Sequence, residues 1–574
     1  MKKILFLIVL FAFAYSQEDL QVKHIKLKGN DAFFTKILKE AVGIDDENFY
    51  FFGKKRVYTS DDIDEIEENI VDFYHSKGFF NVEIKSEIKD DSAIFDIHEN
   101  GRMKIASIDM HSPFYIKNLL AVKQGDYFDA DSFVKSKENI KRYLLENGYP
   151  KADFDAKAFI DIEKYEARLD FNVSNAPKSR FGAVKLPTLP TIDKEHIADK
   201  LAFSEGEYYD IRKIEDSYKN LYSTGVFSDV SIKPDLADKE HPDTPVDINL
   251  TIGKEKSFKV GIGYDTDEGA RIKAGWLHKN FWGNLNKLET MAEVSQIRQN
   301  IGAKLSVPKI FGLEFEDMIK FEKAKYPGFT QKVLSNAFKF RLPYKKVSQY
   351  VGILTENGRV DAENESDLIK SQRFFINALT YEYIVDKRDS ILDAKKGYLF
   401  AMNAEFSDAL FGSSVEYIKS NIEMRKILGF DDNSYFRNFL FAAKANIGMI
   451  NDFKQNDIPV FKRYFAGGSF SNRGYAYRKL GKKDDYGNYI GGNSMIDYSL
   501  ESRYKATKAL WGVLFFDSTL LNEKSMMFNG EYKHSVGFGA RYDTVVGPVR
   551  FDVGFPLRED KKSPVYHISF GQAF

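Results

Sequence analysis

Hydrophobic and polar positions alternate along residues 256–574, which show few helical periodicities. Near the start of this span, the large apolar residues fall on one face, as Phe258, Val260, Ile262 and Tyr264. The small Gly261 and Gly263 fall on the other face. A period of two predicts β-strands with one apolar face. At about 20 residues for each strand with its connection, the span predicts roughly 16 antiparallel strands.

The end of the chain repeats this pattern. A last strand is expected from Pro564 to Phe574, with Phe570 among the outward-facing residues and Gly571 and Ala573 facing inward. Such an alternation also fits a soluble β-sandwich. A sandwich rarely follows a signal peptide and ends on an aromatic residue, so the pattern favours a transmembrane barrel, in which only alternate residues meet lipid.

The first half of the chain contains three similar units. Each has an amphipathic helix, a glycine and then a strand, and the glycines are Gly78, Gly148 and Gly225. Glycine is expected there because the residue after a helix often adopts a left-handed conformation. The helix is expected to start after Asp129 in the second unit and Asp210 in the third, since aspartate is a good N-cap. Each unit is predicted to be β-α-α-β-β.

These patterns divide the chain into five segments. The predicted boundaries are a leader at 1–16, repeats at 17–100, 101–177 and 178–255, and the barrel at 256–574. The fold class is therefore α+β repeats followed by an all-β barrel of about 16 strands.

The N-terminus is typical of a secretory signal peptide. Lys2 and Lys3 precede an apolar run from Ile4 to Ala14, and small residues then allow cleavage before Gln17. A membrane anchor is the alternative, but this run of about 11 residues is short of the ~20 that a spanning helix needs. The signal predicts export, and the barrel predicts residence in the outer membrane.

Composition narrows the function classes. The 83 basic and 84 acidic residues give a net charge of −1, which argues against a general nucleic-acid binder. The absence of cysteine excludes disulfides and thiolate chemistry. Aromatic residues make up 15% of the chain although its mean hydropathy is −0.39, a combination that suits a membrane barrel. The sequence also lacks the common nucleotide-binding and hydrolase motifs, so no enzyme, metal or cofactor is expected.

One glycine-rich segment late in the chain carries a charged motif. It contains Arg473, Gly474 and Tyr475 between two predicted strands. An arginine inside a barrel needs carboxylate partners, because an unpaired buried charge is costly. Glu501 and Asp517 lie on predicted inward-facing strand positions and are the expected partners. The alternative is an arginine in a surface turn.

The order of these features resembles the outer-membrane assembly factor superfamily, in which tandem periplasmic POTRA domains precede a barrel of sixteen strands. Three motifs carry the resemblance: residues 263–269 are similar to the first barrel hairpin, residues 386–397 to an internal hairpin, and Arg473-Gly474-Tyr475 to the signature of a long loop that folds into the lumen. The resemblance implies that Glu501 and Asp517 hold this arginine. Asn472 stands where the family usually has a branched apolar residue.

Within the superfamily, three repeats are most similar to the outer-membrane subunit of the translocation and assembly module, TamA. This resemblance implies outer-membrane protein assembly, with a TamB-like periplasm-spanning partner, unfolded outer-membrane protein clients and contact with outer-membrane lipid. A BamA-like general insertase and a two-partner secretion channel are the alternatives, and a passive porin is a weaker one.

We expect the barrel to insert its clients by opening laterally, at a seam between its first and last strands. Its residues are Phe258, Val260, Gly261, Ile262, Gly263, Tyr264, Phe570, Gly571 and Phe574. Small residues on both edges leave few cross-strand side-chain contacts, so this junction is expected to open.

Overall fold

A computed structural model describes residues 22–44, 57–344, 347–430, 434–453, 458–507, 509–544, 547–557 and 563–573. The predicted signal peptide, residues 1–16, and the terminal Phe574 lie outside the described residues. In the described part of the chain, no helix has both the length and the apolar character needed to cross a membrane.

The three repeats each form a three-stranded sheet, in the orders β1-β3-β2, β4-β6-β5 and β7-β9-β8. The first contains β1 (His24–Lys28), α1 (Thr35–Ala41), α2 (Ser60–Ser76), β2 (Glu83–Lys89) and β3 (Ser92–His98). The second contains β4 (Lys104–His111), η1 (Lys117–Leu119), α3 (Ala130–Glu146), β5 (Phe154–Asp161) and β6 (Glu166–Val173). The third contains β7 (Arg180–Lys185), α4 (Lys194–Ala198), α5 (Ile211–Ser223), β8 (Phe227–Pro234) and β9 (Asp243–Ile252). In each sheet the strand that enters the repeat pairs in parallel with the strand that leaves it.

Local sequence sets the ends of the main helices. Thr59 caps α2 in a reciprocal capping box with Asp62, and the Asp129 carboxylate accepts a hydrogen bond from the Asp131 amide at the start of α3. The helices end before glycines in the left-handed region, Gly78 at φ 89°, Gly148 at φ 91° and Gly225 at φ 67°. The predicted stop glycines are confirmed.

The second repeat differs in detail from the predicted pattern. Where a first helix was expected, it has only the 3-10 turn η1, because Leu120 is already extended at ψ 130°. The Ala121 amide then donates to the Ser136 hydroxyl of α3 rather than to a helical carbonyl.

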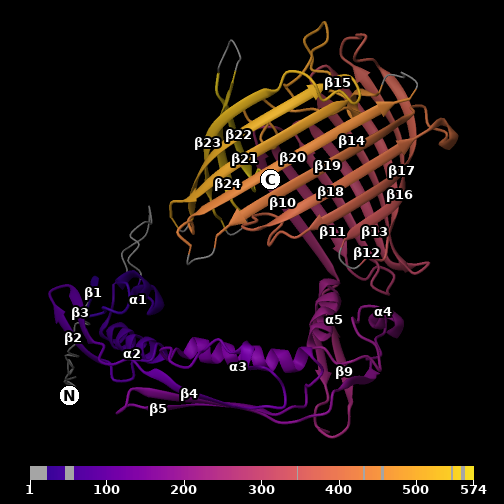
Figure 1. The fold of residues 1–574 in the computed structure, drawn as a ribbon. Coiled ribbons are helices and arrows are strands. Elements are labelled where there is room, and N and C mark those ends of the chain that lie inside the picture. Colours follow the sequence, from indigo (N-terminus) through magenta and orange to yellow (C-terminus); the bar gives the residue numbers. More distant parts are fainter. Residues whose placement is uncertain are drawn as a thin grey trace, which may run out of the picture. The chain divides into compact units, whose positions relative to one another are not determined.

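The barrel is a 16-stranded antiparallel sheet whose strands follow chain order from β10 to β25 (Figure 1). Its first eight strands are β10 (Lys256–Asp265), β11 (Gly269–His278), β12 (Lys287–Ser295), β13 (Arg298–Ile310), β14 (Leu313–Tyr326), β15 (Phe329–Arg341), β16 (Ser348–Ala362) and β17 (Gln372–Asp386). The other eight are β18 (Gly397–Ser407), β19 (Tyr417–Gly429), β20 (Phe439–Asp452), β21 (Ser494–Lys505), β22 (Leu510–Asn522), β23 (Lys533–Tyr542), β24 (Val549–Pro556) and β25 (Val565–Phe570). Short 3-10 turns η2 (Ala409–Phe411) and η3 (Val460–Lys462) lie between strands. The predicted fold class is confirmed.

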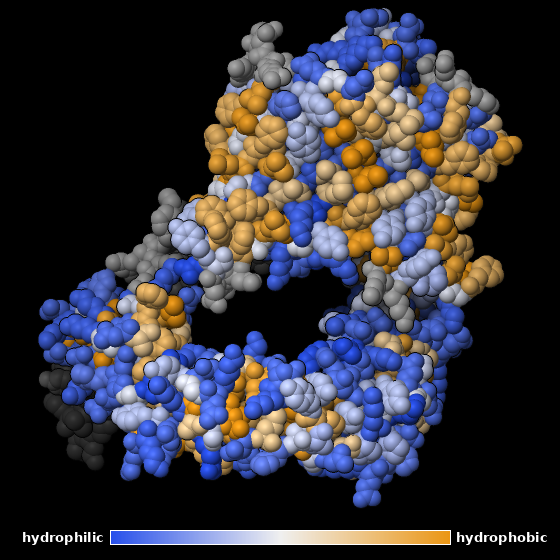
Figure 2. Space-filling view, in the orientation of Figure 1, coloured by the Kyte–Doolittle hydropathy of each residue, from blue (hydrophilic) through white to orange (hydrophobic). Residues whose placement is uncertain are grey.

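The outer surface of the barrel is apolar. Figure 2 shows hydrophobic side chains gathered over the barrel strands, whereas the repeats are mainly hydrophilic. On β10, Val260 and Ile262 are 78% and 84% exposed, as a lipid-facing strand requires. The predicted outward face is thus the exposed one.

The last strand is shorter than the sequence pattern suggests. β25 ends at Phe570, and Gly571 adopts φ 85°, which breaks the extended conformation. After this turn, Ala573 is buried with residues of β19, β20 and β22, and the Gln572 amide donates to Asp393 at 2.8 Å. The expected strand from Pro564 to Phe574 is therefore wrong beyond Phe570, and Gly571 lies at its end rather than within it.

Candidate functional site

The connection between β20 and β21 enters the barrel. We call its described part, residues 458–493, the lumenal segment. It contains Arg473, which is only 1% exposed, and contacts the inner faces of strands from β16 to β25. A long connection inside the barrel needs polar partners for its backbone and charges, and the structure supplies them at Lys462, Arg463, Ser469 and Arg473.

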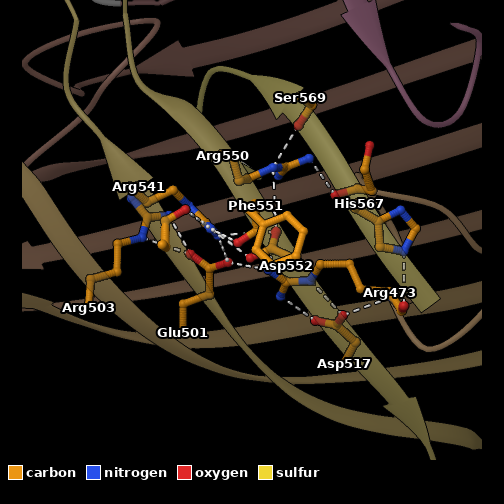
Figure 3. A network of polar contacts seen from close by, with 12 residues as sticks. Arg473, Glu501, Arg503, Asp517, Arg541, Arg550, Phe551, Asp552, His567 and Ser569 are labelled. Carbon is orange, nitrogen blue, oxygen red and sulfur yellow. Dashed lines mark hydrogen bonds and ion pairs between the residues drawn. The ribbon is translucent and has the colours of Figure 1, made fainter. Parts of the chain in front are cut away.

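The Arg473 side chain is held by carboxylates from neighbouring strands (Figure 3). Its Nη2 and Nε atoms lie 2.7 and 2.8 Å from the two carboxylate oxygens of Asp517 on β22, a bidentate pair. Its Nη1 donates to Glu501 on β21 and lies 3.6 Å from Asp552 on β24. The guanidinium carbon also lies 3.5 Å from the ring centre of Phe515. Both predicted partners therefore contact Arg473.

Three more arginines complete what we call the arginine cluster. It comprises Arg473, Arg503, Arg541 and Arg550 with Glu501, Asp517 and Asp552, all of them buried. Arg503 pairs with Glu501, and Arg541 lies 2.6 Å from Asp552. Arg550 donates from Nε to the Ser569 hydroxyl of β25 at 2.8 Å. The cluster thus links β21, β22, β23 and β24 through one set of charges, and Arg550 extends it to β25 through the Ser569 hydroxyl (Figure 3).

Residues 472–474, which we call the tip of the lumenal segment, fit closely against the barrel wall. The Asn472 amide donates to the Lys533 carbonyl at 2.8 Å and accepts from the Ser535 hydroxyl at 2.7 Å. A Cβ on Gly474 would lie 2.4 Å from the Ser535 Cβ, and one on Gly554 would lie 2.2 Å from the Arg473 carbonyl oxygen. Only glycine leaves room at these two positions.

Tyr475 makes an apolar contact. It packs, partly buried, against a small apolar cluster of Ala466, Leu480 and Met495. Of the predicted signature, Arg473 supplies charge, Gly474 allows close approach and Tyr475 supplies apolar contact.

The junction between β10 and β25, which we call the seam, is poorly paired. β10 pairs with β11 over ten residues, but the strand order ends at β10 and β25 with no ladder between them. In the described chain, one backbone hydrogen bond crosses the seam, from the Thr266 amide to the Ile568 carbonyl at 3.2 Å. The sheet is nearly closed but not sealed.

The glycines among the predicted seam residues leave open space around them. A Cβ added to Gly261 or Gly571 would meet no atom within 4 Å, and at Gly263 only Arg271 is near, at 3.8 Å. On the outer face Phe258, Tyr264 and Phe570 are at least 50% exposed. The one predicted seam residue that lies outside the described chain is Phe574.

The lumenal segment bridges the seam from inside. Asp267, in the turn after β10, accepts hydrogen bonds from the Ser469 amide and hydroxyl at 2.8 and 2.7 Å. His567 on β25 lies 3.0 Å from the Arg473 carbonyl oxygen and 3.6 Å from Asp267. Side chains from both edges therefore meet the same short stretch, residues 469–473.

Several of these residues escaped the sequence reasoning. Arg550 and Asp552 alternate with apolar residues, which is compatible with an inward face, but their partners depend on strand register. Arg503 and Arg541 carried the same signal, a charge at an inward-facing strand position. Asn472, unusual for the family, is explained by its hydrogen bonds at the tip. Among the described residues, no group of His, Asp and Glu side chains could hold a metal ion.

Comparison with known proteins places the chain in a family. The Omp85 superfamily domain model matches residues 280–574, and the POTRA model, described as a surface antigen variable number repeat, matches residues 20–100, 102–176 and 188–253. The chain is 23% identical over 506 residues to the outer membrane protein assembly factor BamA of Nitratidesulfovibrio vulgaris, covering 84% of this chain and 61% of that protein. It is 19% identical over 628 residues to BamA of Neisseria meningitidis serogroup B, covering 96% of this chain and 77% of that protein.

Solved structures share the fold. BamA from Haemophilus ducreyi lacking POTRA domains 1-3 matches with a TM-score of 0.63 at 16% identity, over 82% of this chain and 99% of that chain. CdiB from Acinetobacter baumannii matches with a TM-score of 0.50 at 12% identity, over 81% and 89%. The barrel resides in the outer membrane and its repeats in the periplasm. Its sequence and its sheet order agree, and the chain belongs to the Omp85 superfamily.

Proposed function

We propose that this protein is an assembly factor that inserts outer-membrane protein clients through the seam between β10 and β25. The observation that carries the proposal is that, among the described residues, a single backbone hydrogen bond crosses the seam, against ten paired residues between β10 and β11. An edge strand with unpaired amides and carbonyls can template a new strand. The relatives named as outer membrane protein assembly factors support the same class of function.

The narrower assignment is a TamA-like subunit that works with a TamB-like periplasm-spanning partner and with outer-membrane lipid. The three repeats matched by the POTRA model support it. The named relatives support the BamA-like alternative instead. Purification of the protein from its own membrane with its periplasmic partners separates the two: a very long β-rich partner supports the TamA-like assignment, and its absence supports a general insertase.

A secretion channel would need a free path along the lumen. The lumenal segment, with its buried Arg473 and its contacts to both seam edges, lies in that path. This favours lateral insertion over export through the barrel.

Proteoliposomes test the proposed function. Vesicles that contain the purified protein should fold an added, urea-unfolded outer-membrane barrel faster than empty vesicles do, as read by its heat-resistant migration in gels. Equal folding rates would contradict an assembly role. Uptake of an unfolded soluble protein into the vesicles, without faster barrel folding, would support the secretion channel.

A further inference from the structure

The lumenal segment has a second buried cation, far from the arginine cluster in the strand order. Lys462, at the end of η3, is 5% exposed. Its ammonium lies 2.7 Å from Glu356 on β16 and also pairs with Glu405 on β18. A lysine taken out of water between two strands is stable only with such partners.

The surrounding groups complete a balanced set. Lys419 on β19 donates to the Lys462 carbonyl oxygen at 2.8 Å, and the Tyr417 hydroxyl donates to Glu405 at 2.6 Å. The two lysines and two glutamates cancel in charge. Removing one member alone would leave a buried charge without its partner.

Apolar contacts hold the same end of the segment. Ile458, Val460 and Ile490 belong to a buried core with side chains of β14, β15, β16, β17, β19 and β20. The Phe461 ring stacks on Phe374 of β17, with ring centres 4.3 Å apart. The ion pairs and the apolar contacts thus act together at this end of the segment.

Strand order gives the position of this second attachment. β16, β17, β18 and β19 are the seventh to tenth strands of a sheet whose sixteen strands run from β10 to β25. In a nearly closed barrel these middle strands lie opposite the seam. Arg473, by contrast, is held by β21, β22 and β24, close to the seam. The lumenal segment therefore spans between opposite walls.

We propose that Lys462 is a positioning residue that holds the lumenal segment against the wall opposite the seam, so that the lumen stays obstructed while the seam opens. The inference rests on the proposed lateral function. Opening displaces the end strands most and the middle strands least, so the attachment at Lys462 persists when contacts at Asp267 and His567 part. Clients then enter the membrane through the seam, while solutes do not cross through the lumen.

Substitution tests the attachment. Lys462→Met leaves Glu356 and Glu405 with one cation between them and should raise ion conductance across planar bilayers several-fold. The matched control is Lys479→Met, an exposed lysine of the same segment, which should leave conductance unchanged. The double variant Lys462→Met with Glu356→Gln restores charge balance around Lys419 and Glu405 and should bring conductance back toward the wild type. Heat-resistant gel migration checks that each barrel is folded. Wild-type conductance in folded Lys462→Met would overturn the proposal.

An engineered disulfide, here called a staple, tests the attachment at Lys462 without removing the lysine. Cysteines at positions 461 and 374 should form a disulfide that ties the lumenal segment to β17, and client folding in proteoliposomes should be unchanged. A second staple, between cysteines at 266 and 568, closes the seam and should stop client folding. If both disulfides stop client folding, the lumenal segment must move during insertion. The Lys462 inference then fails, while the proposed lateral function stands. If the seam staple has no effect, the proposed function fails.

Discussion

Arg473 connects the lumenal segment to three strands near the seam through one side chain. Its bidentate contact with Asp517 and its contact with Glu501 are buried and charge-assisted, the strongest class of polar contact in proteins. Loss of one partner in such a set costs on the order of a few kcal/mol, because the remaining charges stay buried. At the residue scale, function should be most sensitive here.

A charge reversal tests this sensitivity. Arg473→Glu places a third carboxylate beside Glu501 and Asp517 and should strongly impair client assembly. Lys479→Glu, the same change at an exposed lysine, should have little effect. The measurement is the rate of client folding in proteoliposomes, at equal amounts of each variant. Equal and negligible effects would leave Arg473 without a special role.

Close packing at the tip gives a second test. Gly554→Ala places a Cβ 2.2 Å from the Arg473 carbonyl oxygen, so the tip must shift and the barrel should lose about 1–3 kcal/mol of stability. Gly512→Ala on β22 is the matched control, since a Cβ there meets nothing within 4 Å. Urea unfolding followed by tryptophan fluorescence should separate the two variants. Identical midpoints would mean that the tip is not docked as described.

At the scale of elements, sequence periodicity predicts what depends on neighbouring residues. Alternation predicted the barrel strands, and glycine position predicted the ends of α2, α3 and α5, because both are local. The end of β25 was missed, since alternation continues through Gly571 while its positive φ does not show in the pattern. The partners of Arg541 and Arg550 were missed because strand register brings them together. The arginine cluster is thus a product of tertiary structure.

The repeats carry a prediction of their own. Residues 17–255 should fold without the barrel, because each repeat has its own sheet and the first two have separate buried cores. The exposed edges of these sheets would then be available to bind extended peptides. Circular dichroism of this fragment should show mixed helix and strand and a cooperative thermal transition. An unstructured spectrum would contradict the predicted domain boundaries.

The junction between the first and second repeats should respond to acid. Burial raises the pKa of Asp129, but hydrogen bonds from Ser132 and Lys77 outweigh it and hold the pKa below its ordinary value. A lowered pKa in the folded state adds stability above about pH 4, which is lost as the pH falls and the carboxylate is protonated. Urea unfolding of the repeat fragment should show this loss as the pH falls below about 4.

Asp129→Asn isolates the charge in that experiment, because asparagine keeps the N-cap hydrogen bond. The variant should be less stable than the wild type at pH 7, and its stability should fall less steeply in acid. The same pH dependence in both proteins would show that the pair of Lys77 and Asp129 contributes nothing.

At the scale of the whole barrel, strand pairing and contacts with the lumenal segment are unevenly distributed. The middle strands are long, continuously paired and tied to the lumenal segment by Lys462 and an apolar core. Among the described residues, one backbone hydrogen bond crosses the seam, from Thr266 just after β10 to Ile568 on β25, and residues 469–473 bridge the two edges. In the described part of the barrel the weakest strand junction is thus the seam, and the lumenal segment contacts both of its edges. Our proposal that clients insert at the seam rests on this difference between the middle strands and the end strands.

A disulfide across the seam tests this claim most directly. The chain has no cysteine, so cysteines at positions 266 and 568, which share the one backbone hydrogen bond, give a clean background. Cysteines at 274 and 292, a facing pair within the continuous ladder of β11 and β12, are the control. Oxidation should stop client folding in proteoliposomes only for the seam pair, and reduction should restore it. Full activity of the completely crosslinked seam variant would contradict lateral insertion.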